Sequence, residues 1–235
     1  MSGRLPVANS SLTVLKMLGI LVMLLDHYNV FVRDEYSLVL YEAGRLALPL
    51  FACVLGYNLA RIDAAQMPKI MLRLLLFGTL ATPLYNLLSG GLWHWWPLNV
   101  MFTLLLATAV VYLLALPASG WPALALQLAA VLLFVLAGSM VDYLWVGPAL
   151  VVVIWRWCSD VSAAERVVLG FGVLLVLALL ARLNQSLAGW LALPLIFLFT
   201  RLFRQVRLPR LKWFFYWFYP GHLLVLLVYR TLLQG

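Results

Sequence analysis

Residues 12–32 read LTVLKMLGILVMLLDHYNVFV, an apolar run in which only Lys16, Asp26 and His27 can carry charge near neutral pH. A helix needs about 20 apolar residues to cross the hydrocarbon core of a bilayer. The run is too long for the apolar region of a cleavable signal peptide, and Arg33-Asp34-Glu35 follow it instead of a small-residue cleavage site. This stretch therefore predicts a transmembrane helix.

The rest of the chain has the same character. Of its 235 residues, 66% are hydrophobic and 10% are charged, and the mean hydropathy is +1.03. A soluble domain averages about 45–50% apolar and about 25% charged residues, so this chain has too few charges to cover a surface that faces water. Because a helix satisfies its own backbone hydrogen bonds in lipid, the long apolar runs predict an all-α, polytopic integral membrane helical bundle.

The apolar runs predict about nine transmembrane helices in a single domain, residues 1–235. The expected spans are 12–32, 43–60, 70–88, 98–116, 122–138, 144–157, 166–183, 187–203 and 213–233. The sixth span is short and contains Gly147-Pro148, which predicts a kink or protection by neighbouring helices. The chain shows no internal repeat and no linker long enough to separate domains.

The distribution of basic residues predicts a cytoplasmic N-terminus. In that orientation the cytoplasmic side receives eleven Lys and Arg residues and the outer side four, which is the expected bias. The eleven are Arg4, Arg61, Lys69, Arg73, Arg156, Arg166, Arg201, Arg204, Arg207, Arg210 and Lys212, and the four are Arg33, Arg45, Arg182 and Arg230. The net charge of +8 thus lies in short connections, where it meets anionic lipid headgroups. We expect membrane lipids as partners, and no nucleic acid.

Lys16 and His27 lie eleven positions apart in the first span. They therefore return to nearly the same helix face, about 16 Å apart along the axis. Ionisable residues at membrane depth mark functional sites by default. For Lys16 two interpretations stand equally: a functional cation, or a side chain that snorkels to the inner headgroups.

Asp26 points about 100° away from His27, so its expected partner is a cation from another helix. Arg45 enters the second span from the same outer side. The two residues predict an ion pair, and a purely structural pair that joins two helices would explain it fully.

The last span begins with Lys212 and an aromatic run that ends at Tyr219, as at a membrane interface. Pro220-Gly221 follows, and because proline removes a helix hydrogen bond we expect the helix to open there and to free a backbone carbonyl. His222 then lies about 14 Å into the membrane. A lone histidine is more often a satisfied core residue, but one behind this break is a candidate for function.

Further polar residues enter from the outer side. Asn99 begins the fourth span, Thr103 lies one turn below it, and Asp142 lies in the turn before the sixth span. For Asn99, ligand binding and helix–helix hydrogen bonding are equally good interpretations. Cys53 and Cys158 lie in different spans and give no metal-binding spacing, so no metal is expected.

Five segments, taken in order, resemble one family. They are Asp26-His27; residues 44–51 (GRLALPLF) with Gly56-Tyr57 and Arg61; residues 73–77 (RLLLF); residues 98–104 (LNVMFTL); and residues 212–222 (KWFFYWFYPGH). Together they are similar to the TraX family, integral inner-membrane proteins associated with N-terminal acetylation of conjugative pilin. The spacing of Lys16 and His27 also resembles the first helix of the acyltransferase-3 group, in which an arginine precedes a histidine.

The resemblance implies a membrane acyltransferase of the bacterial inner membrane. Its donor would be acetyl-CoA, and its acceptor the N-terminal amine of a conjugative pilin subunit or another membrane-inserted acceptor. Two other classes stay open. A non-catalytic pilin maturation or assembly factor would tolerate the loss of both histidines. A small transporter would also suit intramembrane charges, but such proteins often show repeated halves, which this chain lacks.

The acyltransferase hypothesis gives each candidate residue a role. The attacking amine must be neutral, and because an α-amino group has a pKa of about 8, a general base assists: His27 first, His222 second. Asp26 and Arg45 would hold the site together. The candidate donors to the oxyanion are His222, Asn99 and Tyr219.

The two substrates approach from opposite sides in this hypothesis. Acetyl-CoA is charged and cytoplasmic, whereas an N-terminus freed by signal cleavage is presented from the outer side. We expect the phosphates to lie near Lys16 and the pantetheine arm to run along the first helix toward His27. The surrounding positive field would come from Arg61, Lys69, Arg73 and the cluster at 201–212.

Overall fold

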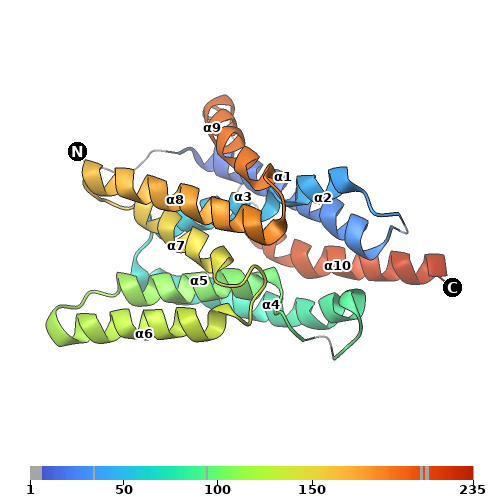
Figure 1. Ribbon diagram of the computed structural model, residues 1–235, viewed down its shortest axis with the longest axis horizontal. Coiled ribbons are helices and arrows are strands. Elements are labelled where there is room, and N and C mark those ends of the chain that lie inside the picture. Colours follow the sequence, from blue (N-terminus) through green and yellow to red (C-terminus); the bar gives the residue numbers. More distant parts are fainter. Residues whose placement is uncertain (1–6, 34, 94, 207–208, 210–211, 235) are drawn as a thin grey trace.

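A computed structural model describes residues 7–33, 35–93, 95–206, 209 and 212–234. Arg4, Arg207 and Arg210 of the expected cytoplasmic set lie outside the described residues. The described chain is all-helical, which confirms the predicted fold class (Figure 1). Its elements are α1 Asn9–Phe31, α2 Leu38–Gly44, α3 Ala47–Leu59, η1 Ala64–Gln66, α4 Met67–Ser89, α5 Val100–Ala115, α6 Gly120–Gly138, α7 Val146–Cys158, α8 Ala163–Asn184, η2 Ala188–Leu191, α9 Ala192–Leu202 and α10 Lys212–Gln234.

Each expected span coincides with a helical segment. Five segments of the described chain are long and apolar enough to cross a membrane, so the protein is a membrane protein. They are Asn9–Phe31, Leu38–Leu59, Ala64–Ser89, Gly120–Gly138 and Ala163–Asn184. Three apolar segments are shorter: Val100–Ala115, Val146–Cys158 and Ala188–Leu202. The count of nine crossings and the cytoplasmic N-terminus stay predictions.

The surface of helix α6 is apolar and mostly not buried against other helices. Only 6% of its most apolar 18-residue stretch is buried inside the protein. Leucine and valine side chains cover its outer surface, among them Leu128, Leu132 and Leu136. An apolar surface of this size is stable against lipid tails and unstable in water. Hydropathy therefore does not separate the lipid-facing from the packed faces of this bundle.

The second expected span is broken in the structure. Instead of one helix over 43–60, α2 ends at Gly44 and α3 begins at Ala47, with Arg45 at the junction. Pro49 lies in the first turn of α3 and has no N–H to donate to the Arg45 carbonyl, four residues earlier. The break between α2 and α3 therefore lies at Arg45, where this helical hydrogen bond is missing.

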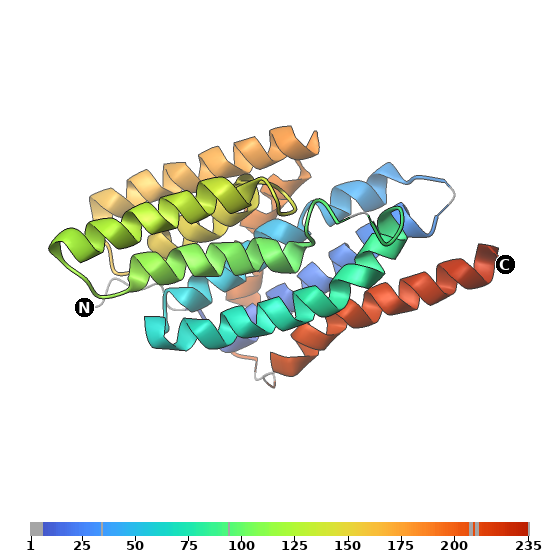
Figure 2. The same ribbon diagram turned by 90° about the horizontal axis from the view of Figure 1, so that it is seen from below.

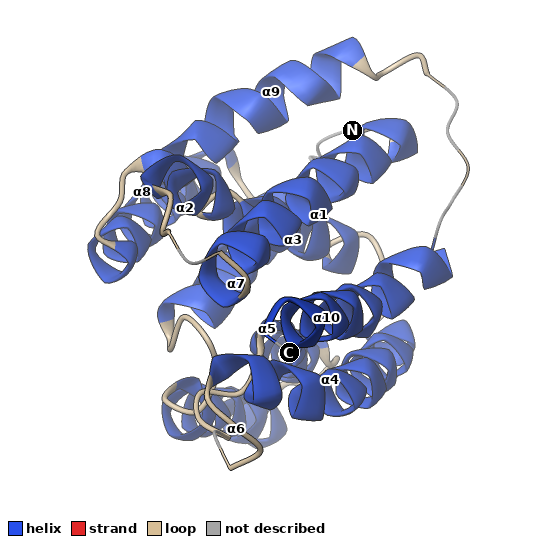
Figure 3. Ribbon diagram, turned by 90° about the vertical axis from the view of Figure 1, so that its right-hand side faces the viewer, coloured by secondary structure: helices blue, strands red, loops and turns tan. Residues whose placement is uncertain are grey.

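The helices of the two ends of the chain lie together. Figure 2 shows α10 alongside α4 with α1 next to it, and residue contacts join α10 to both helices. Figure 3 shows α9 at one side of the bundle, extended lengthwise across the view. The expected opening at Pro220-Gly221 is wrong, since α10 is continuous from Lys212 to Gln234 with Pro220 inside it.

Candidate functional site

The two candidate histidines meet inside the bundle. His27 of α1 and His222 of α10 are 195 residues apart in sequence, and Nδ1 of His27 lies 2.8 Å from Nε2 of His222. Their rings are nearly parallel, at an interplanar angle of 10° with centroids 5.0 Å apart. His222 is buried. The contact therefore joins the first and last helices through one hydrogen bond.

The partners of His222 fix where the protons lie in the neutral pair. Nδ1 of His222 is 3.0 Å from the backbone carbonyl of Phe218, and because a carbonyl only accepts, this nitrogen carries the proton. Nε2 of His222 is then an acceptor, so Nδ1–H of His27 donates to it. Nε2 of His27 keeps its lone pair and is the basic atom of the pair.

This arrangement separates the roles of the two histidines. Both ring nitrogens of His222 are engaged, one with Phe218 and one with His27, which leaves no N–H for an oxyanion. His27 lines a cavity, whereas His222 is absent from the described lining of both cavities below. The geometry thus places His222 behind His27 as its hydrogen-bond support.

Asp26 and Arg45 form the predicted ion pair. Nη2 of Arg45 donates to Oδ2 of Asp26 at 2.6 Å, and both side chains are largely buried. The guanidinium also lies over the ring of Tyr41, 4.1 Å from its centroid. Gly44 allows the close approach of α2 to α1, because a Cβ added there would lie 2.4 Å from Cβ and Cγ of Asp26.

A cavity of about 410 Å³ lies at the ends of the helices that the predicted topology places on the outer side. We call it the outer cavity. It is lined by charged or titratable side chains and by apolar ones, the former being Asp26, His27, Arg45, Tyr85, Asp142, Tyr143 and Tyr219. The Asp26–Arg45 ion pair and His27, whose Nε2 is the basic atom, therefore line the same cavity.

The connection between α6 and α7 forms part of this cavity wall. Tyr143 and Leu144 have φ values of +61° and +50°, a left-handed conformation that costs a non-glycine residue about 1–2 kcal/mol. The connection is fixed to α5, since the Asp142 amide donates to the Leu98 carbonyl at 2.8 Å and the Thr103 hydroxyl to the Asp142 carbonyl at 2.7 Å. Strained residues of this kind are held by their surroundings and cluster at functional sites.

Asn99 has a structural role in this arrangement. Its Oδ1 accepts from the Met101 amide at the start of α5, and its Nδ2 donates to the Gly78 carbonyl and the Thr82 hydroxyl of α4. Asn99 is buried and is absent from the described lining of both cavities. Of its two interpretations, helix–helix hydrogen bonding is the one the structure shows.

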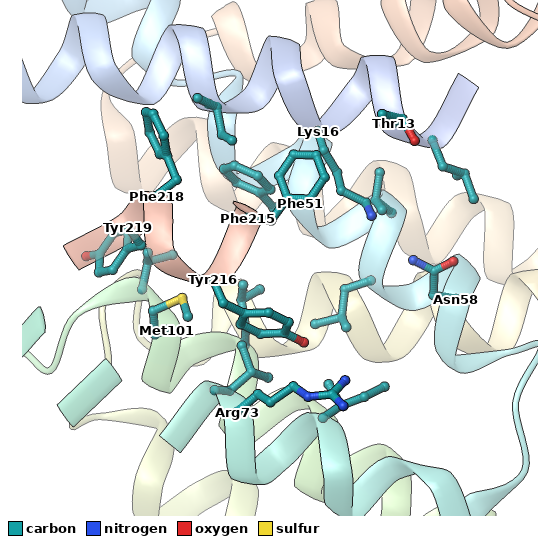
Figure 4. Close-up of a pocket in the computed structure, with 18 of the residues that line it drawn as sticks. Thr13, Lys16, Phe51, Asn58, Arg73, Met101, Phe215, Tyr216, Phe218 and Tyr219 are labelled. Atoms are coloured by element: carbon teal, nitrogen blue, oxygen red, sulfur yellow. The ribbon is translucent and has the colours of Figure 1, made fainter. Parts of the chain in front are cut away.

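A second, larger cavity of about 810 Å³ lies toward the other end of the bundle (Figure 4). We call it the inner cavity. Four cationic side chains line it and no carboxylate does among the described residues; the four are Lys16, Arg61, Lys69 and Arg73. Nζ of Lys16 lies over the Phe215 ring at 4.6 Å from its centroid, and Arg73 lies over Trp213 at 5.0 Å. Figure 4 shows the polar ends of Lys16 and Arg73 away from Tyr219 at the far end.

The two cavities are adjacent. Four residues from α1, α3, α5 and α10 line both of them, Met23, Phe51, Val100 and Tyr219, and we call these four the neck. The Val100 backbone N–H is directed at the Tyr219 hydroxyl oxygen, which acts as the acceptor, and the ring centroid of Tyr219 is 6.4 Å from that of His27. His27 is thus a neighbour of one of the neck residues, Tyr219.

Other candidates lie elsewhere. Cys53 and Cys158 are absent from the described lining of both cavities, and the part of the chain that the structure describes holds no group of three potential metal ligands. Asp142 is predicted from the sequence only as a turn residue, without a role in the site. Its one signal was a carboxylate between two apolar runs, which says nothing about the cavity it faces.

Comparison with known proteins identifies the family. The family model described as TraX protein matches residues 11–230. Protein TraX from Escherichia coli is 32% identical over 222 residues, which cover 91% of this chain and 84% of that protein. No solved structure gives a significant match. The chain therefore belongs to the TraX family.

Proposed function

We propose that this protein is an acyltransferase of the bacterial inner membrane that moves an acetyl group from acetyl-CoA to a primary amine. The proposed acceptor is the N-terminus of a conjugative pilin subunit or another membrane-inserted protein. The observation that carries the proposal is the position of His27, which lines the outer cavity and whose ring centroid lies 6.4 Å from that of Tyr219, a residue that lines both cavities.

The inner cavity suits the donor. Coenzyme A carries phosphates at its nucleotide end, and a cavity with four cations and no carboxylate among its described lining residues attracts such an anion. The polar ends of Lys16 and Arg73 lie away from Tyr219, so phosphates bound to them would direct the pantetheine arm and its thioester toward Tyr219 and His27. The nucleotide would stay out of the apolar neck, where desolvating its charges is costly.

In the proposed reaction, one base, His27, carries the proton from the amine to the leaving thiolate. The amine nitrogen attacks the thioester carbonyl carbon, and Nε2 of His27 accepts the proton that the nitrogen loses. The C–N bond forms, the C–S bond breaks, and the imidazolium returns the proton to the thiolate sulfur of coenzyme A. During the transfer Nδ1–H of His27 stays hydrogen-bonded to His222.

Tyr219 is the proposed donor to the oxyanion. It lines both cavities, whereas the amide hydrogens of Asn99 and the N–H of His222 are already used. A hydroxyl positioned before the reaction stabilises the developing charge without reorganisation. The Asp26–Arg45 pair supports the site by fixing α1 against α2.

The intact mass of the pilin tests the proposal. Pilin would be purified from cells that carry the wild-type protein, no protein, or the His27→Ala variant. We expect one added acetyl group only with the wild type. Acetylated pilin in the His27→Ala cells would refute the role of His27, and unmodified pilin in all three, with normal pilus assembly only when the protein is present, would instead favour a non-catalytic assembly factor.

A further inference from the structure

Among its described lining residues, the outer cavity has two carboxylates, Asp26 and Asp142, and one guanidinium, Arg45. Arg45 is paired with Asp26 at 2.6 Å, and Asp142 has no ion pair within the described residues. Oδ1 of Asp142 accepts only the short-range bond from the Tyr143 amide at 3.0 Å. With His27 neutral, the charged groups of the cavity sum to one net negative charge.

The position of Asp142 is fixed by its backbone. The Leu98 carbonyl and the Thr103 hydroxyl bind the peptide groups of Asp142, and the two residues that follow are in the left-handed conformation. These contacts hold the carboxylate on the cavity wall while leaving its side chain free of a cationic partner. A charge that is positioned but unpaired inside a protein is costly, and a ligand of opposite charge would stabilise it.

We propose that Asp142 binds the ammonium form of the acceptor in the outer cavity. This inference rests on the proposed function for the identity of the ligand, an acceptor amine, and it names the residue that recognises it. A charge-assisted hydrogen bond joins the ammonium to the carboxylate, and the faces of the surrounding rings, Tyr85, Trp96, Tyr143 and Tyr219, favour a cation. The same negative charge disfavours coenzyme A, so each substrate has its own cavity.

The pH dependence of binding follows from the two ionisations. Burial raises the pKa of the Asp142 carboxyl to about 6, whereas an α-amino group has a pKa of about 8. Between pH 7 and pH 5 the amine therefore stays charged while Asp142 becomes protonated. The groups that face Asp142 in the cavity are Asp26, His27, Arg45, Tyr85, Tyr143 and Tyr219.

A bound ammonium still has to become an amine before it attacks. Its first proton leaves to water at the outer mouth, and its second is the one that His27 transfers to the thiolate. The complete reaction thus consumes one ammonium and one thioester, and it yields one amide, one thiol and one released proton.

Direct binding without donor tests the subsite. The full chain in nanodiscs would be dialysed at pH 7.2 against phenylalanine amide, a minimal α-amine, and against N-acetyl-phenylalanine amide, its neutral counterpart, with empty nanodiscs as blank. We expect the amine to bind at least about tenfold more tightly than the acetylated form. Asp142→Asn keeps the acceptor for the Tyr143 amide and should weaken amine binding at least about tenfold, whereas Glu35→Gln, a change on the exposed loop after α1, should not.

The wild-type protein provides a second measurement that needs no variant. Its affinity for phenylalanine amide should fall roughly tenfold from pH 7 to pH 5, the factor that a carboxyl with a pKa of about 6 imposes. Equal affinity of wild type and Asp142→Asn, a flat pH profile, equal binding of the acetylated form, or no amine binding at all would overturn the inference. Because no acetyl transfer is measured, amine binding without acetylated pilin would refute the proposed function alone.

Discussion

Removing the imidazole of His222 is the sharpest test of how His27 is set up as a base. In His222→Leu, Nδ1–H of His27 loses its acceptor at 2.8 Å inside an apolar environment. An unsatisfied buried donor costs about 1–3 kcal/mol. The ring escapes this cost by moving its proton to Nε2 or by rotating, and either change removes the lone pair that faces the cavity.

The expected loss follows from that energy. If the productive tautomer becomes less favourable by about 1–3 kcal/mol, kcat falls roughly 5- to 150-fold, since about 1.4 kcal/mol corresponds to a factor of ten. KM for acetyl-CoA should stay within about twofold, because His222 is absent from the described lining of the inner cavity. In His222→Gln the amide oxygen accepts from His27 Nδ1–H and the amide N–H₂ donates toward Phe218, so this variant should recover most of the activity.

The assay combines kinetics with a direct view of the tautomer. Steady-state acetylation of an amine acceptor in nanodiscs gives kcat and KM, and ¹⁵N chemical shifts of the His27 ring report which nitrogen is protonated. Thermal unfolding of both variants separates a local effect from a loss of folding. A kcat of His222→Leu within about twofold of wild type, or a loss in His222→Gln as large as in His222→Leu, would refute the reasoning.

Three further perturbations test the donor site, the packing and the topology. Lys16→Ala should raise the Kd of acetyl-CoA roughly 10- to 150-fold, since a hydrogen bond to a charged group contributes about 1.5–3 kcal/mol. Arg182→Ala, a change at an exposed residue absent from the described lining of both cavities, should leave it unchanged; a donor affinity of Lys16→Ala equal to that of wild type would mean that Lys16 only snorkels. Gly44→Ala should destabilise the protein by about 1–3 kcal/mol, because the added Cβ would collide with Asp26, and the Tm should fall. Gly221→Ala should not lower the Tm, because a Cβ added there has no atom within 4 Å. A single cysteine at residues 203–206 should resist a membrane-impermeant reagent added outside intact cells, and one at residues 90–93 should react; the opposite pattern would reverse the orientation.

The membrane bundle and the positions of its helices along the chain are predictable from the amino-acid sequence alone. Span length and composition are local properties, because each helix must satisfy its own backbone in lipid whatever it packs against. The Asp26–Arg45 pair was predictable for a related reason, since a buried charge needs a partner and few oppositely charged residues lie on the same side. Lys16 and His27 were likewise placed on one helix by spacing alone.

The contacts between these helices could not be predicted in the same way. In a bilayer, lipid tails and packed side chains are equally apolar, so the sequence carries little signal for which helix faces contact one another. The contact between His27 and His222 spans 195 residues, and the proton positions depend on the Phe218 carbonyl that the unbroken α10 presents. Asn99 and Asp142 both begin as polar residues near the outer side; the fold buries one in hydrogen bonds between α4 and α5 and turns the other toward a cavity, because helix packing alone determines what each polar group can reach.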